Sequence, residues 1–196
     1  MLKGARTKTA ILDHATGLAS QVGLTGLTIG VLADDLNLSK SGLFAHFKSK
    51  EALQIDVLNH AADRFREVVV RPALQEARGA PRIRALFERW LAWGRSEALP
   101  GGCVFVAATA ELDDRPGPVR ERLVELQRDW LAAITLSFGK GIEAGLFREG
   151  ADPAQLAQDL YGIMLSYHLH TRLLGDAAAE TRARRTFERL LKEIAR

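Results

Sequence analysis

The stretch TIGVLADDLNLSKSGLFAHF, residues 28–47, constrains the fold of this chain more than any other part of its sequence. It contains two short helical patterns separated by a tight turn. Two helices joined by a turn of three or four residues form a helix-turn-helix, so the stretch predicts one. Apolar residues recur at helical spacing in both patterns: Ile29, Leu32, Ala33 and Leu36 in the first, Leu43 and Phe47 in the second.

Polar residues at the ends of the two patterns predict where the helices begin and end. Thr28 precedes the first pattern, and its hydroxyl can accept hydrogen bonds from free backbone N–H groups. Asn37 follows that pattern and tolerates the left-handed backbone that a helix-ending turn requires. Ser39 stands where it can cap the second helix. We therefore expect one helix after Thr28, a turn at Asn37 and a second helix after Ser39.

The first turn of the second helix carries residues suited to DNA. The second helix of such a motif enters the major groove with its N-terminal end. Lys40 can reach guanine acceptors or a phosphate, Ser41 can hydrogen-bond to either, and Gly42 allows close backbone approach. The periodicity alone fits two ordinary amphipathic helices in an all-helical core equally well.

Residues 26–53, GLTIGVLADDLNLSKSGLFAHFKSKEAL, resemble the DNA-binding domain of the tetracycline-repressor-like (TetR) family of bacterial transcription regulators. The rest of the chain is similar to that family only in length and helical character. The resemblance implies an all-α fold with an N-terminal three-helix DNA-binding head, residues 1–50, and a C-terminal helical ligand-binding and dimerisation domain, residues 51–196. It rests on these residues in this order: Thr28, the run from Ile29 to Ala33, Ser39, Leu43-Phe44, His46-Phe47, Ser49-Lys50 and Leu53.

The sequence departs from the family pattern at two positions. Asn37 stands where Gly is common, and Asn can take the same backbone angles. Phe44 stands where the family commonly has a Tyr whose hydroxyl bonds a DNA phosphate, so that contact is absent. Lys50 can offer a phosphate its ammonium and a nearby helix N-terminus, against the alternative of an ordinary surface lysine. The predicted DNA-binding residues are Thr28, Ser39, Lys40, Ser41, Gly42, Phe44, His46 and Lys50.

Composition fits a soluble globular protein but does not by itself mark a nucleic-acid binder. Apolar residues make up 47% of the chain and charged residues 26%, with a net charge of +3. Lys3, Arg6 and Lys8 precede the first acidic residue, and this basic arm could lie along phosphates or be a solvated, frayed terminus. A single cysteine fits a reducing cytoplasm. No signal peptide or membrane-spanning run is apparent, so we expect a cytoplasmic protein with no membrane partner.

Helical patterns continue to the end of the chain. Arg71-Pro72 interrupts them, and Gly and Pro clusters separate the rest. The pattern near residue 160 is apolar on most sides, which indicates a subunit interface, although a central core helix would show the same pattern. We find no internal repeat. The expected helices outside residues 28–47 cover about residues 8–22, 49–65, 82–98, 103–112, 118–144, 153–174 and 177–195.

The family resemblance implies three partners for the chain. These are a palindromic double-stranded DNA operator, a second copy of the chain and an unknown small-molecule inducer. We expect the second copy to bind through the last two helices, residues 153–174 and 177–195. The inducer would favour a state whose two heads are wrongly spaced for DNA. Aromatic residues with a few polar tips are candidates for its pocket, and plain core packing is the alternative for each of them. They are Phe87, Trp90, Trp93, Cys103, Phe105, Trp130, Tyr161, Tyr167 and His168.

The sequence does not favour catalysis. Cys103 lies in an apolar run, where a thiol is usually inert. His168 and His170 are two residues apart and point to different sides of a helix, so they cannot share a metal. No catalytic or phosphate-binding motif is present. We expect neither enzyme activity nor a cofactor or metal. A DNA-binding architectural protein without an inducer remains the alternative to a ligand-responsive repressor.

Overall fold

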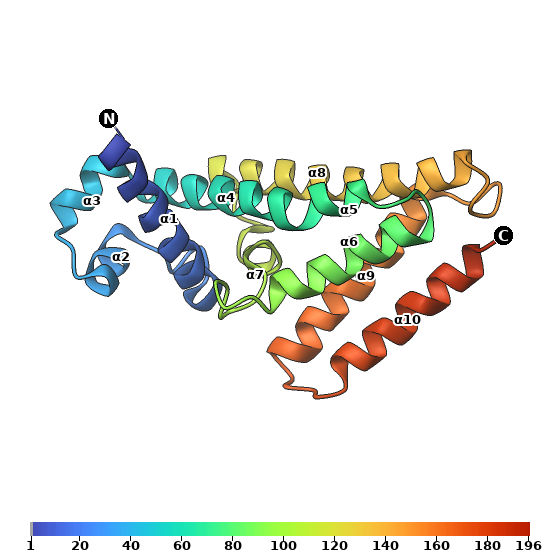
Figure 1. The fold of residues 1–196 in the computed structure, drawn as a ribbon. Coiled ribbons are helices and arrows are strands. Elements are labelled where there is room, and N and C mark those ends of the chain that lie inside the picture. The colour runs from blue at the N-terminus through green and yellow to red at the C-terminus, as the bar shows by residue number, and fades with distance from the viewer. Residues whose placement is uncertain (1) are drawn as a thin grey trace. The chain divides into compact units, whose positions relative to one another are not determined.

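The computed structural model describes residues 2–196, with side chains from Lys8 onward, and it is helical almost throughout (Figure 1). This confirms the predicted all-α fold class. An isolated antiparallel bridge joins Phe147 and Ala195. None of the described helices is both long and apolar enough to cross a bilayer. The helices are α1 Leu2–Val22, α2 Ile29–Leu36, α3 Lys40–His46, α4 Lys50–Phe65, the π-helical η1 Arg66–Val70, α5 Arg71–Gln75, α6 Ala80–Gly94, α7 Val104–Leu112, α8 Pro118–Glu143, α9 Pro153–Arg172 and α10 Ala179–Ile194.

The chain divides into two compact units. The first comprises Met1–Arg64 and Arg95–Leu126, and the second comprises Phe65–Gly94 and Gln127–Arg196. The first unit therefore contains α7 and the beginning of α8 in addition to the helix-turn-helix. The predicted division by function, residues 1–50 and 51–196, stays a prediction.

The core of the first unit forms where α1 packs with the helix-turn-helix and α4. On α1 the buried face comprises Ile11, Leu12, Ala15 and Ala19, whereas Val22 at the end of the helix is 45% exposed. Val22 lies on the same side of the helix as Ile11 and Ala15, but it is the last residue of α1 and the core does not cover it. The other buried apolar side chains of this core include Leu27, Leu32, Leu43, Phe47, Leu53 and Val57.

The core of the second unit lies among α6, α9 and α10. Helices α9 and α10 lie side by side as a hairpin (Figure 1). Helices α6 and α10 also share a short sequence motif, RxRxxFERxL, which corrects the expectation that the chain has no internal repeat. Buried side chains of the three helices include Ile83, Phe87, Trp90, Leu160, Met164, Tyr167, Phe187 and Leu191.

Several expected helix boundaries were wrong. Pro72 does not interrupt the helical chain but occupies the first turn of α5, where its missing N–H costs least. The π-helical segment η1 directly precedes it, and such wide turns occur where a regular helix is disturbed. The described backbone of α1 is already helical at Leu2, and α6 ends at Gly94 rather than near residue 98.

The start of the last helix also differs from the expected start at residue 177. The carboxylate of Asp176 accepts a hydrogen bond from the Ala178 N–H at 2.9 Å, which closes a turn just before the helix. The helix itself begins at Ala179, two residues later than expected, and the N-cap residue Ala178 has no side-chain cap. Helix α9 begins at Pro153, as predicted, and ends at Arg172, and the Asp152 side chain caps its first turn.

Candidate nucleic-acid interface

Local hydrogen bonds define the helix-turn-helix as its sequence predicts. The Thr28 hydroxyl accepts a hydrogen bond from the Val31 N–H at 3.1 Å, and the Ser39 hydroxyl accepts one from the Gly42 N–H at 3.1 Å. Asn37 adopts the left-handed conformation with φ 52° and ψ 39°. The predicted caps and turn are therefore confirmed.

Apolar side chains beneath the motif set the rotation of α3. Leu43 is fully buried and Phe47 is 1% exposed, and both pack in the core that contains Leu32. Because these two anchors point inward, the residues between them on the helix face the solvent. One side of α3 is therefore packed in the core, and the other side is exposed to solvent.

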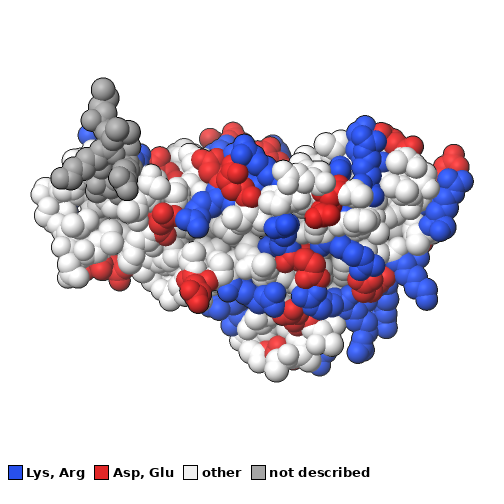
Figure 2. Space-filling model, viewed as in Figure 1, with Lys and Arg blue, Asp and Glu red and all other residues white. Residues whose placement is uncertain are grey.

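The free side of α3 carries most of the predicted DNA-binding residues. Ser39, Lys40, Ser41, Gly42 and Phe44 are exposed, whereas Thr28 and His46 are half-buried. The phenyl ring of Phe44 is 50% exposed, and apolar contact with a thymine methyl is a known mode of base readout. On the face seen in Figure 2 the surface over α2 and α3 carries few charged side chains.

Gly42 has a structural role in addition to its predicted one. A Cβ at this position would lie 3.1 Å from the Ser39 hydroxyl oxygen, which caps the same helix turn. A side chain here would press on the cap. Gly42 therefore protects the start of α3 and leaves its backbone open to a close approach.

Lys50 has an intramolecular partner. Its ammonium donates a hydrogen bond to the Thr25 carbonyl at 2.6 Å, so its charge lies against the turn between α1 and α2. The predicted phosphate contact of Lys50 would have to share or replace this bond. The Gln54 amide donates to the neighbouring Leu24 carbonyl at 2.5 Å, so α4 holds this turn at both carbonyls.

Glu111 of α7 holds the same turn from the other side, and the sequence analysis did not find it. Its carboxylate accepts hydrogen bonds from the Leu24 N–H at 3.1 Å, the Thr25 N–H at 2.7 Å and the Thr25 hydroxyl at 2.6 Å. Gly23, with φ 80°, makes room for it, because a Cβ there would lie 2.6 Å from a Glu111 carboxylate oxygen. Nothing in the local pattern around Glu111 marks it, since its partners lie more than 80 residues away.

Ion pairs fasten α1 to α4. Asp13 accepts hydrogen bonds from His60, at 2.9 Å, and from Arg64. Burial opposes ionisation of Asp13, but these hydrogen bonds and charges outweigh it and lower the pKa of the carboxyl group below its ordinary value. Lys8, the last residue of the predicted basic arm, pairs with Asp56 at 2.6 Å. The side chains of Lys3 and Arg6 lie outside the described residues.

The predicted ligand-pocket residues fall in both units. Cys103 and Phe105 are buried in the first unit, and the other seven belong to the second. Trp93 and Trp130 each meet the ring of Phe65 edge-on, with centroid separations of 5.5 and 4.9 Å. Trp90 meets Tyr167 in the same way at 6.1 Å. Most of the set therefore packs as aromatic core.

Some polar atoms of this predicted set are buried without a partner. The indole nitrogens of Trp93 and Trp130 and Nε2 of His168 have no hydrogen-bond partner among the described residues. Burial, reinforced by the nearby charge of Arg172, lowers the pKa of His168, so its ring is neutral at neutral pH. Buried donors without acceptors are rare in folded proteins and call for an explanation.

The second unit also contains a groove of about 780 Å³ between α9 and α10, of which only Tyr167 belongs to the predicted pocket. Its charged lining residues include Asp159, Glu193, Arg182 and Arg189. The helix that forms one wall, α9, exposes an apolar row beside it. The members of this row are Leu165 and Leu169 on α9, with Leu173 and Leu174 directly after the helix, and they are 38–76% exposed.

Comparison with known proteins covers most of the chain. Residues 11–57 match the family described as bacterial regulatory proteins, tetR family, and residues 79–187 match the tetracyclin repressor-like C-terminal domain. The HTH-type transcriptional repressor NemR of Escherichia coli K12 is 24% identical over 169 residues, which are 85% of this chain and 84% of that protein.

Solved structures of other proteins share the fold of this chain over nearly its whole length. A TetR transcriptional regulator from Chloroflexus aurantiacus is 25% identical with a TM-score of 0.85, covering 98% of this chain and 96% of that one. AibR, solved in complex with isovaleryl coenzyme A and operator DNA, is 21% identical with a TM-score of 0.72, covering 95% and 96%. The chain therefore belongs to the tetracycline-repressor-like (TetR) family of transcription regulators.

Proposed function

We propose that this regulator is a repressor that binds a palindromic operator as a homodimer and leaves it when a small molecule binds the second unit. The exposed first turn of α3 carries the DNA-binding part of the proposal. Lys40, Ser41 and Gly42 are free of the core because Leu43 and Phe47 hold the opposite side of the helix. This is the end of the helix that enters the major groove in helix-turn-helix proteins.

The groove and the exposed row on α9 support the homodimer. Monomeric proteins rarely expose a contiguous apolar row of this kind, so a partner surface is expected to cover it. The groove carries both acids, Asp159 and Glu193, and bases, Arg182 and Arg189. In a two-fold arrangement a second copy brings the same residues and can pair each charge with its opposite. Helices α9 and α10, close to the predicted ranges 153–174 and 177–195, are the proposed interface.

The unpartnered indole donors support a ligand in the second unit. Trp93 and Trp130 present N–H groups that lack acceptors, and His168 is uncharged, so the ligand that suits them is an apolar molecule bearing hydrogen-bond acceptors. AibR, which shares the fold, was solved with isovaleryl coenzyme A, an acyl thioester with a carbonyl acceptor. For the present protein we propose only that the inducer is an apolar molecule with hydrogen-bond acceptors, as the acyl part of that thioester is.

The proposal is tested first on DNA. Fragments of genomic DNA are selected with the wild-type protein, and affinity for a selected fragment is measured by fluorescence anisotropy at two salt concentrations. Lys40→Ala and Ser41→Ala are each expected to weaken binding by about 10-fold, the usual effect of losing one good base or phosphate contact. Both variants should retain the wild-type melting temperature.

Lys140→Ala is the matched control, because it removes the same charge from α8, outside both the helix-turn-helix and the proposed interface. It should leave the affinity unchanged. Equal binding of selected and random DNA by the wild-type protein would contradict the operator proposal. Specific binding that no apolar acceptor-bearing compound relieves would favour the inducer-free architectural protein instead.

A further inference from the structure

A ten-residue motif occurs twice in the second unit, once on α6 and once on α10. Residues 82–91 are RIRALFERWL and residues 182–191 are RARRTFERLL. Six of the ten positions are identical, and they include both signs of charge and one aromatic residue. The identical pairs are Arg82 and Arg182, Arg84 and Arg184, Phe87 and Phe187, Glu88 and Glu188, Arg89 and Arg189, and Leu91 and Leu191.

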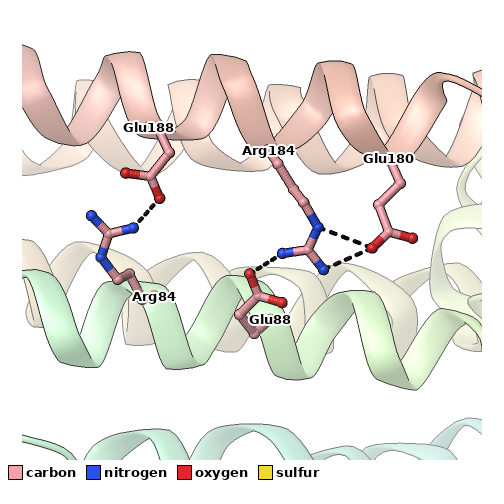
Figure 3. Close-up of polar contacts among 5 residues, drawn as sticks. All are labelled: Arg84, Glu88, Glu180, Arg184 and Glu188. Carbon is pink, nitrogen blue, oxygen red and sulfur yellow. Dashed lines mark hydrogen bonds and ion pairs between the residues drawn. The ribbon is translucent and has the colours of Figure 1, made fainter.

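The two copies pack directly against each other. Phe87 stacks on Phe187 with a centroid separation of 4.2 Å and an interplanar angle of 17°. Arg84 pairs with Glu188, and Arg184 pairs with Glu88 (Figure 3). Each arginine therefore meets the glutamate of the other copy. This exchange requires the helices to run antiparallel, with a local two-fold axis near the stacked phenylalanines.

Additional contacts reinforce both ends of this arrangement. The Arg84 guanidinium lies 6.0 Å from the centroid of the Phe187 ring, within the range of a cation–π interaction. Arg184 is also held by Glu180 of its own helix, with N–O separations of 2.9 and 2.7 Å (Figure 3). Arg184 therefore reaches Glu88 from a fixed position rather than as a free surface side chain.

The spacing of the charges makes the pairing specific for one register. If α10 slid by one turn in one direction, Arg84 would face Arg184 and Glu88 would face Glu180. If it slid by one turn in the other direction, Glu88 would face Glu188 and Arg84 would face Lys192. Either slip replaces two attractive pairs with two like-charge pairs. Of these three registers, only the observed one places each of the four charges opposite a charge of the other sign.

We propose that this duplicated motif is a register lock, a device that lets α6 and α10 rock about the Phe87–Phe187 stack but prevents them from sliding past each other. One-turn slides of packed helices are a known form of conformational switching. The lock excludes a one-turn slide of α10 along α6. Movements of α6 therefore reach α10 as rotation or tilt.

The register lock affects the groove because α10 lines the groove with one face and contacts α6 with another. Arg182, Thr186 and Arg189 line the groove, while Arg184, Phe187 and Glu188 face α6. A slip of one turn would displace the groove-lining residues by about 5.4 Å along the helix axis. This consequence rests on the proposed dimer, in which the groove receives a second copy. The lock itself can be tested without the dimer or DNA. Figure 2 shows acidic and basic side chains interleaved over α6 and α10.

A charge-exchange cycle tests the lock. One variant exchanges the charges on α6, Arg84→Glu with Glu88→Arg, and a second exchanges those on α10, Arg184→Glu with Glu188→Arg. A third variant carries both exchanges. All proteins, including the reference, carry Glu180→Gln, so that residue 184 never faces a like charge on its own helix. Every member of the cycle has the same composition and net charge as the reference.

Each single exchange should lower the midpoint of thermal unfolding by roughly 3–8 °C, as expected for two attractive pairs turned repulsive in a chain of this size. The double exchange restores the attractive pairing and should recover the midpoint to within about 2 °C of the reference. The loss should shrink in 1 M NaCl, where charges are screened beyond about 3 Å, which a packing defect would not show. Lys140→Glu with Glu143→Lys, an exchange of an exposed pair within α8, is the control and should change little.

The dimer dissociation constant, measured on the same proteins by sedimentation equilibrium, tests the consequence for the groove. It should rise at least 10-fold in each single exchange and recover in the double one. A double exchange no more stable than the single ones, or single exchanges as stable as the reference, would overturn the lock. A cycle that behaves as expected in unfolding, in a protein that is monomeric throughout, would support the lock and refute the proposed dimer.

Discussion

At the scale of single residues, Glu111 shows how one side chain can position a DNA-binding motif. It provides the acceptors for two backbone N–H groups and one hydroxyl in the turn between α1 and α2. Glu111→Ala should lower the free energy of unfolding by about 2 kcal/mol, because charged hydrogen bonds of this kind contribute roughly 1.5–3 kcal/mol and the site is only partly buried. Urea denaturation measures the loss, and hydrogen exchange should accelerate at Leu24 and Thr25.

Thr25→Val provides the control for Glu111, since it removes the hydroxyl bond and keeps both backbone bonds to the carboxylate. Its cost should be about 1 kcal/mol, the usual contribution of one hydrogen bond. A Thr25→Val variant as unstable as Glu111→Ala would mean that the hydroxyl bond, and not the clamp on the backbone, holds the turn.

At the scale of elements, the end of α2 depends on the backbone of Asn37. This residue is exposed and has φ 52°, so its contribution is conformational rather than a matter of packing. Asn37→Ala should cost about 1 kcal/mol, because a Cβ-bearing residue without a local hydrogen-bonding side chain strains the left-handed region. Asn37→Gly should match or exceed the stability of the wild-type protein. Thermal unfolding of the two variants measures this difference. An Asn37→Gly variant as unstable as Asn37→Ala would show that the Asn37 side chain, and not its backbone conformation, stabilises the end of α2.

At the scale of the whole molecule, the exposed row on α9 ties regulation to assembly. Leu169→Glu places a charge in the middle of the proposed interface and should turn a dimer into a monomer, with DNA affinity falling by more than 10-fold as the second head is lost. Sedimentation equilibrium and anisotropy report the two effects. Leu136→Glu, at a leucine on α8 that is more exposed than Leu169, is the control and should remain dimeric. A wild-type protein that is monomeric at micromolar concentration would refute the interface.

Local sequence predicted the parts of the fold and site that local hydrogen bonds create. Thr28, Asn37 and Ser39 have their predicted roles because a cap or turn involves residues only two to four positions apart. Leu43 and Phe47 are buried as expected because helical periodicity assigns them to one face. Pro72 was misread because the π-helical turn that accommodates it leaves no clear pattern in the sequence.

Long-range partners could not be predicted in this way. Lys50 looks like a free lysine until the fold brings the Thr25 carbonyl within 2.6 Å of its ammonium. The repeat on α6 and α10 is visible in the printed sequence, but only packing shows that its two copies bind each other. The predicted pocket residues share an aromatic chemistry, yet they divide between two compact units.

The sequence by itself determined the helical class, the helix-turn-helix with its caps and the outward side of α3, because these depend on spacing and on bonds between near neighbours. Only the tertiary structure decided what each charge pairs with. Glu111, Lys50 and the arginines of α6 and α10 meet their partners across 25 to 104 residues of chain. A pairing at that separation depends on how the helices pack, and the same charged side chain would serve as a free surface group in another packing.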